Sequence, residues 1–220
     1  ILTMLHLLKN KTFLLFFIGN ITSLIGFGFN LIAISWMVLE KSGSEYLLGK
    51  IMASATAPGL VLAIFAGVII DKVNRKWLLV FLDIFRLIVV SVFLYFISKF
   101  NFEVSFLYPV AFFMGLGNSL FWPTAQAFVQ ELVSEKDYFN ANKLLSASYQ
   151  VGSIFGAGVG GLVVHAYSPI VALWINILTY IVSAIFISLA PFKRKNLYTE
   201  ETNLFDLIMK GFSYLRKRVD

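Results

Sequence analysis

One group of ionisable residues with a definite spacing forms a short turn between two long apolar runs. The runs, Leu47 to Ile70 and Trp77 to Ile97, are each long enough to cross a hydrocarbon core of roughly 30 Å as a helix. The turn between them must then lie at one face of a membrane, and its cations predict that this face is cytoplasmic. The residues of the turn that could carry a function are Gly67, Asp71, Lys72, Arg75 and Lys76.

A second ionisable group lies inside the apolar run that follows the turn. Asp83 and Arg86 are three residues apart, which places them on one face of a helix. A charge inside a membrane is unfavourable unless it is paired or hydrated. The pair is therefore either a local ion pair that also engages the turn, or a relay for protons or substrate. We favour the structural or gating role, because both residues lie nearer the membrane face than its middle.

The composition excludes several classes of protein. The chain is 59% hydrophobic and only 14% charged, with a mean hydropathy of +0.82, which indicates a membrane protein. Its net charge of +6 comes from cations in short loops between apolar runs, which argues against nucleic-acid binding. The chain has no cysteine, so disulfides and thiol chemistry are excluded. His6 and His165 are isolated, and no catalytic triad or metal-spaced cluster occurs, so we do not expect an enzyme.

The elements that must position these groups are apolar helices. The predicted fold class is an all-α membrane protein with six transmembrane helices. The predicted spans are Phe13 to Leu39, Leu47 to Ile70, Trp77 to Ile97, Val104 to about Phe128, Ala141 to Ala166, and about Ile170 to Ala190.

Lysine and arginine are distributed unequally over the loops between these spans. With the amino terminus inside, the outer side holds only Lys41, Lys50 and Lys99, and Arg86 lies within a span. All other cations fall on the inner side. By the positive-inside rule this predicts an integral protein of the plasma (inner) membrane with a cytoplasmic amino terminus.

The turn carries a resemblance to a known family. Its pattern, Gly-x-x-x-Asp-Lys-x-x-Arg-Lys, resembles the loop between helices 2 and 3 of the major facilitator superfamily of secondary transporters, and Asn74 is a mild departure from it. The resemblance implies a bundle of two inverted three-helix repeats. It also implies that Asp71 braces this half against a carboxy-terminal half in the outward-facing state, with Arg75 in the same charge network. The arginine that this family often carries in helix 4 is replaced by Ala111, and Arg86 could supply that cation instead.

The fifth span contains closely spaced glycines. The residues from 152 to 161 resemble an exporter signature, Gly-x-x-x-Gly-Pro-x-x-Gly-Gly, with Ala157 in place of the proline. Dense helix packing alone could also explain such a run. With Ala141-Asn142 and the segment from Trp122 to Ala127, the resemblance is closest to the branch of macrolide-efflux and enterobactin-exporter permeases. The glycines of the signature are Gly152, Gly156, Gly160 and Gly161.

Two stripes of amide and aromatic residues are candidates for a substrate cavity. Each stripe falls on one face of its helix. Such side chains would suit a mostly apolar solute with a few polar groups, but hydrogen bonding between helices would explain them equally well. The candidates are Asn118, Trp122 and Gln126 on the fourth span, and Asn20, Phe27 and Asn30 on the first.

The carboxy-terminal segment differs in kind from the spans. Residues 1–191 form the predicted bundle, and residues 192–220 form a cytoplasmic linker whose apolar residues recur at helical spacing. In the resembled family such a segment joins two six-helix halves. We therefore expect a second half outside this chain, in a protein about twice its size.

The function expected from these features is secondary active transport. We expect an exporter of amphipathic small molecules that works by alternating access, driven by a proton or sodium gradient and without a bound cofactor. Its partners would be the lipid bilayer, the substrate and the carboxy-terminal half. The alternatives are a siderophore or lysophospholipid transporter, and a non-transporting six-helix scaffold or homodimer. A proton-coupling acid would be Asp83 or would lie in the second half.

Overall fold

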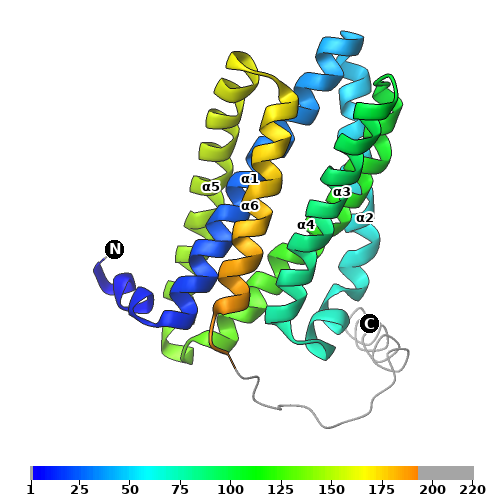
Figure 1. Cartoon of the computed structure of the whole chain (residues 1–220). Coiled ribbons are helices and arrows are strands. Elements are labelled where there is room, and N and C mark those ends of the chain that lie inside the picture. The colour runs from blue at the N-terminus through cyan, green and yellow to red at the C-terminus, as the bar shows by residue number, and fades with distance from the viewer. Residues whose placement is uncertain (1, 193–220) are drawn as a thin grey trace.

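The computed structural model describes residues 2–192, which form a single bundle of long helices (Figure 1). Six of these helices are long and apolar enough to cross a membrane, which confirms the predicted all-α membrane fold. They are α1 (Lys11–Ser42), α2 (Glu45–Lys72), α3 (Arg75–Lys99), α4 (Leu107–Leu132), α5 (Tyr138–Ala166) and α6 (Pro169–Leu189). Among the described residues, the 3-10 helix η1 (Leu2–Lys9) precedes α1, and two more, η2 (Val104–Phe106) and η3 (Glu135–Asp137), lie in connections between the long helices. The predicted amphipathic linker helix lies outside the described residues.

Short polar residues explain where four of the helices begin. The side chains of Asn10, Ser44, Asn74 and Ser168 accept hydrogen bonds from backbone N–H groups in the first turns of α1, α2, α3 and α6. Asn74 is the departure from the family pattern, and it allows α3 to start with only two residues between it and the end of α2. The α2–α3 turn is therefore very tight, as the sequence predicted.

Helices that follow each other in sequence are not always the ones that pack together. α1 packs against α5 and α6, α4 packs against α2 and α3, and α3 also packs against α6. α2 and α3 make few contacts although the tight turn joins them. Glycines permit two of the close approaches: a Cβ at Gly28 would collide with the backbone of Gly156 on α5, and one at Gly115 with the backbone of Ala55 on α2.

The core consists of two hydrophobic clusters, one toward each end of the bundle. One includes Met37, Val90 and Leu107, and the other includes Phe16, Leu79 and Phe128. Buried polar side chains from the middle of α1, α3 and α6 lie between these clusters. The bundle therefore has a polar layer inside an apolar core.

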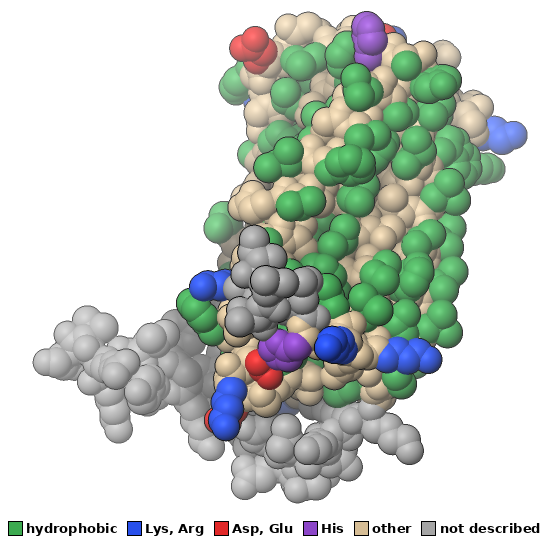
Figure 2. Space-filling view, turned by 90° about the vertical axis from the view of Figure 1, so that its left-hand side faces the viewer, with side chains coloured by type: hydrophobic (Ala, Val, Ile, Leu, Met, Phe, Trp, Pro, Cys, Tyr) green, Lys and Arg blue, Asp and Glu red, His purple; other side chains and the backbone are tan. Residues whose placement is uncertain are grey.

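The outside of the bundle fits a lipid environment. Figure 2 shows charged side chains gathered toward the two ends, with hydrophobic side chains covering the region between them. The α2–α3 turn, the start of α1 and the end of α6 lie at one end. The hydroxyl of Thr12 donates to the carbonyl of Pro191 (2.8 Å), and Lys76 Nζ donates to the carbonyl of Ala190 (2.7 Å).

Candidate functional site

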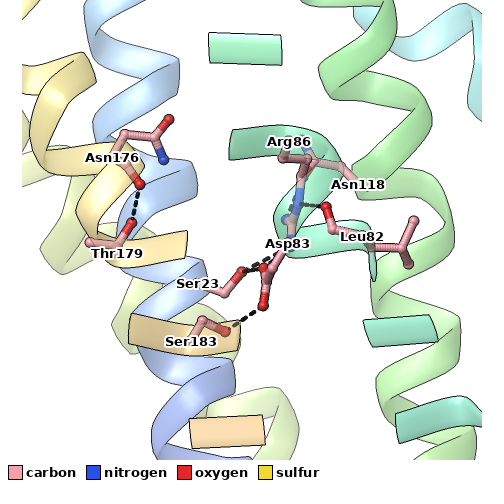
Figure 3. Close-up of polar contacts among 8 residues, drawn as sticks. All are labelled: Ser23, Leu82, Asp83, Arg86, Asn118, Asn176, Thr179 and Ser183. Atoms are coloured by element: carbon pink, nitrogen blue, oxygen red, sulfur yellow. Dashed lines mark hydrogen bonds and ion pairs between the residues drawn. The ribbon is translucent and has the colours of Figure 1, made fainter. Parts of the chain in front are cut away.

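Asp83 and Arg86 form an ion pair at the centre of the polar layer (Figure 3). Asp83 is fully buried and Arg86 is 2% exposed. Ser23 on α1 donates to Asp83 Oδ1 (2.9 Å), and Ser183 on α6 donates to Asp83 Oδ2 (2.6 Å). One carboxylate of α3 thus binds both α1 and α6.

The guanidinium of Arg86 extends the same network to a fourth helix. Its Nη1 donates to Oδ1 of Asn118 on α4 (2.9 Å), and its Nη2 donates to Oγ of Ser23 (3.0 Å) as well as to Asp83. The guanidinium carbon also lies 4.2 Å from the ring centre of Phe121 and 4.6 Å from that of Tyr180. These contacts compensate the buried charge, as charges inside a membrane require.

The sequence interpretation linked this pair to the α2–α3 turn, and the structure shows a different arrangement. Apart from bonds within α3, the hydrogen bonds of Asp83 and Arg86 within residues 2–192 run across the bundle to α1, α4 and α6. Arg75 of the turn binds other residues. The pair therefore belongs to the middle of the bundle rather than to its end.

A cavity of about 370 Å³ opens beside Arg86. This volume is within the usual range for small-molecule sites. The cavity combines aromatic walls with amide and hydroxyl groups, and α1, α3, α4 and α5 all contribute to it. Its lining residues are Leu24, Phe27, Arg86, Asn118, Phe121, Trp122, Ser146, Tyr149 and Gln150.

Three of the six predicted cavity residues line this cavity: Phe27, Asn118 and Trp122. Two others lie in helix interfaces instead. Asn20 is fully buried and donates to Ser148 on α5 (3.1 Å), and Asn30 is 6% exposed and donates to Asn176 on α6 (3.4 Å). These two positions follow the alternative interpretation, hydrogen bonding between helices. Gln126 is partly buried and does not line the cavity.

The sequence interpretation missed the α5 side of the cavity. Ser146 and Gln150 are four residues apart on α5, and Tyr149 precedes Gln150. The ring centre of Tyr149 lies 5.0 Å from that of Trp122. This polar and aromatic stripe on a membrane helix was a readable signal. The neighbouring glycines drew the interpretation of α5 toward an exporter signature or helix packing instead.

The α2–α3 turn is tied to the ends of α4 and α6. Arg75 pairs with Asp71 (2.8 Å) and with Glu131 near the end of α4 (2.8 Å), and it donates to the carbonyl of Ala127 (3.2 Å). The side chain of Asp71 is 67% exposed, whereas those of Arg75 and Glu131 are 18% and 14% exposed. The role of Glu131 could not be foreseen from the turn motif.

Three other residues of the turn motif have different surroundings. Lys76 is buried and binds the carbonyl of Ala190 at the end of α6. Lys72 is exposed in the last turn of α2. A Cβ at Gly67 would meet no other described atom within 4 Å, so this glycine faces open space on the bundle.

The glycines of α5 divide into two groups. A Cβ at Gly152, Gly156 or Gly160 would meet α1 at Leu24, Ile25 or Phe29, so these three form the close α1–α5 contact. A Cβ at Gly161 would meet nothing within 4 Å among the described residues. Packing within the bundle therefore accounts for three of the four glycines of the signature.

Comparison with known proteins identifies the family. The profile described as transmembrane secretion effector, a branch of the major facilitator superfamily, matches residues 3–219. The chain belongs to the transmembrane secretion effector family. Its members are transporters rather than enzymes, which confirms the expectation from sequence.

Two relatives of this chain carry names that describe efflux or export. It is 24% identical over 174 residues to the multidrug efflux pump Tap of Mycolicibacterium fortuitum, covering 76% of this chain and 42% of Tap. It is 29% identical over 185 residues to the putative bacilysin exporter BacE of Bacillus amyloliquefaciens, covering 84% of this chain and 45% of BacE. The chain thus spans about half the length of these curated relatives.

A solved structure supports the fold of the secretion effector chain independently. The crystal structure of the POT family transporter PepTSo superposes with a TM-score of 0.63 at 15% identity, covering 93% of this chain and 46% of that one. At this identity the likeness concerns the fold alone. It confirms a major facilitator-like arrangement of the six helices.

Proposed function

We propose that this chain is the amino-terminal half of a secondary exporter of amphipathic small molecules that works by alternating access. The observation that carries the proposal is the cavity beside Arg86, with aromatic walls and a few amide and hydroxyl groups, in a chain of the transmembrane secretion effector family. Such a lining suits solutes that are largely apolar with a few polar groups. The efflux activities named for Tap and BacE support the direction of transport.

The packing order supports two inverted repeats of three helices. Exchanging α1 for α4, α2 for α5 and α3 for α6 turns the α1–α5 contact into α4–α2 and the α1–α6 contact into α4–α3, and it leaves α3–α6 unchanged. These are the main packing pairs of the bundle. We infer that the half is built from α1–α3 and α4–α6 as repeats, with the cavity between them.

The α2–α3 turn is the proposed conformational switch. Arg75 is fixed to α4 through Glu131 and Ala127, while the carboxylate of Asp71 is mostly exposed to the outside of the bundle. A carboxylate in this position can reach a helix of the second half and brace the two halves in the outward-facing pose. Among residues 2–192 the space beside Gly67 is open, which leaves room for such a helix.

The Asp83–Arg86 pair is proposed to hold the bundle together. Its carboxylate is completely buried and binds Ser23, Ser183 and Arg86 at once. This favours a permanent ion pair that links the helices over a proton relay. We therefore place the group that couples transport to a proton or sodium gradient in the second half. The basic end of the bundle is proposed to face the cytoplasm.

Transport by reconstituted full-length protein tests this proposal. Proteoliposomes with an imposed proton or sodium gradient should move amphipathic compounds against their concentration, and dissipating the gradient with an ionophore should stop the flux. Asp71→Asn should reduce the flux strongly. Lys41→Gln changes a charge in the last turn of α1, at the other end of the bundle, and should leave the flux unchanged. If none of a panel of amphipathic compounds shows gradient-dependent flux, the proposal is wrong.

A further inference from the structure

The amide of Asn118 has a fixed orientation at the wall of the cavity. Its Oδ1 accepts a hydrogen bond from Nη1 of Arg86 (2.9 Å), and a guanidinium can only donate. The oxygen of the amide therefore has to face Arg86, and the Nδ2 group faces away from it. Because Asn118 lines the cavity, Arg86 forces this residue to offer N–H donors to whatever the cavity contains.

Arg86 itself has one N–H group beyond those that bind α1, α3 and α4. A guanidinium has five N–H groups. Within the described residues, Nε donates to the carbonyl of Leu82, Nη2 donates to Ser23 and Asp83, and Nη1 donates once, to Asn118. The remaining hydrogen is on Nη1, beside Asn118, and Arg86 is among the residues that line the cavity.

The carboxylate that balances Arg86 is turned away from the cavity. Asp83 is fully buried, its oxygens are engaged by Ser23 and Ser183 as well as by Arg86, and it does not line the cavity. None of the cavity-lining residues in the described part of the chain is acidic. The rings of Phe121 and Tyr180 lie near the guanidinium and keep it in place.

We infer that this half of the cavity selects amphipathic compounds whose polar group accepts hydrogen bonds, such as a carboxylate or a carbonyl, over compounds that carry an ammonium group. The donors of Asn118 and Arg86 form one corner, and the aromatic walls bind the apolar body of the same molecule. An ammonium in this corner would face the positively charged guanidinium of Arg86. Because an ammonium only donates hydrogen bonds, it could not bind the N–H groups of Asn118 and Arg86. The inference rests on the proposed function, because it assigns the substrate class of the same cavity.

Three probes that share one ring system test the inference: 2-naphthoate, 2-acetylnaphthalene and 2-naphthylmethylammonium. Their affinities are measured at pH 7 by titration calorimetry on the full-length transporter in nanodiscs. The carboxylate should bind about tenfold more tightly than the ammonium, as expected for a hydrogen bond to a charged group, with the ketone between them. A preference for the ammonium, or binding of none of the three, would overturn the inference.

Asn118→Asp is the decisive variant, because it replaces the donors with an acceptor of the same size that can still bind Arg86. It should reverse the order, so that the ammonium binds more tightly than the carboxylate. Gln130→Glu adds the same charge at an exposed position of α4 and should keep the wild-type order. Asn118→Leu removes its donors without adding charge and leaves those of Arg86, so it should weaken the preference without reversing it. An unchanged order in Asn118→Asp would contradict the inference.

Gradient-driven flux of the same probes separates this inference from the proposed function. A protein that binds the carboxylate best but moves no probe supports the inference and contradicts the proposed function. A protein that moves the ammonium best supports export and contradicts the inference.

Discussion

Two aspartate–arginine pairs involve α3, and their surroundings give them different properties. One pair joins the end of α2 to the start of α3, and the other lies in the middle of α3. Asp71 and Arg75 meet at the end of the bundle, where the aspartate is 67% exposed. Asp83 and Arg86 meet between four helices, where the aspartate is fully buried. An exposed pair contributes little to stability and can open and re-form, whereas a buried pair cannot lose one partner without leaving an uncompensated charge. The same two residue types thus suit a conformational switch at the α2–α3 turn and a permanent link between helices in the middle of the bundle.

Removing the buried carboxylate should give the largest effect. Asp83→Asn leaves Arg86 without its counter-charge, and the free energy of unfolding should fall by about 3 kcal/mol or more. The measurement is denaturant or thermal unfolding of the purified protein in detergent. The double variant Asp83→Leu with Arg86→Met should recover much of the loss, because it removes both charges. A single variant as stable as wild type would show that the pair does not hold the bundle.

The α1–α5 contact should give the next largest effect. Gly156→Ala places a Cβ against the backbone of Ile25, and such overpacking costs about 1 to 3 kcal/mol. Gly161→Ala is the matched control on the same helix, since its Cβ meets nothing among the described residues, and its effect should stay within about 0.5 kcal/mol. Equal losses in both variants would argue against the glycine contact.

The partner of Arg75 on α4 should give a smaller effect. Glu131→Gln removes the ion pair but keeps a hydrogen-bond acceptor next to Arg75, so a loss of about 1 kcal/mol is expected. Unfolding of this variant should be compared with that of Gln130→Glu, which changes an exposed neighbour. If Glu131→Gln lowered the free energy of unfolding as much as Asp83→Asn, the charges at the α2–α3 turn and the buried pair would not differ in stability as proposed.

The exposed carboxylate should give the smallest change in stability. Asp71→Asn removes one partner of an exposed pair, which is worth less than about 0.5 kcal/mol. Its melting curve should therefore overlay that of the wild type. A clear shift to lower temperature would mean that Asp71 contributes to the fold of this half.

The sequence predicted the spans and which charged residues share a helix face, because both depend on local patterns, but it linked the Asp83–Arg86 pair to the wrong part of the bundle. Hydrophobic runs determine which segments cross a membrane, and a spacing of three or four residues determines which charges share a helix face. The turn could also be placed, because its charged residues lie between two apolar runs.

The contacts between helices could not be predicted in the same way. Asn20, Asn30 and Asn118 are all amides in membrane helices, yet the first two bind α5 and α6 while the third lines a cavity. The rotation of each helix about its axis decides between these outcomes, and that rotation is set by neighbours distant in sequence. For the same reason the partnership of Arg75 with Glu131 was missed.

The central claim is that the exposed pair acts in transport and the buried pair acts in folding. The most direct test measures melting temperature and gradient-driven flux on one preparation of full-length protein carrying Asp71→Asn. The account predicts an unchanged melting temperature with flux reduced by about tenfold or more, as for the loss of about 1.4 kcal/mol in the stability of one conformational state. Flux equal to that of the wild type, or a melting temperature as low as that of Asp83→Asn, would contradict it.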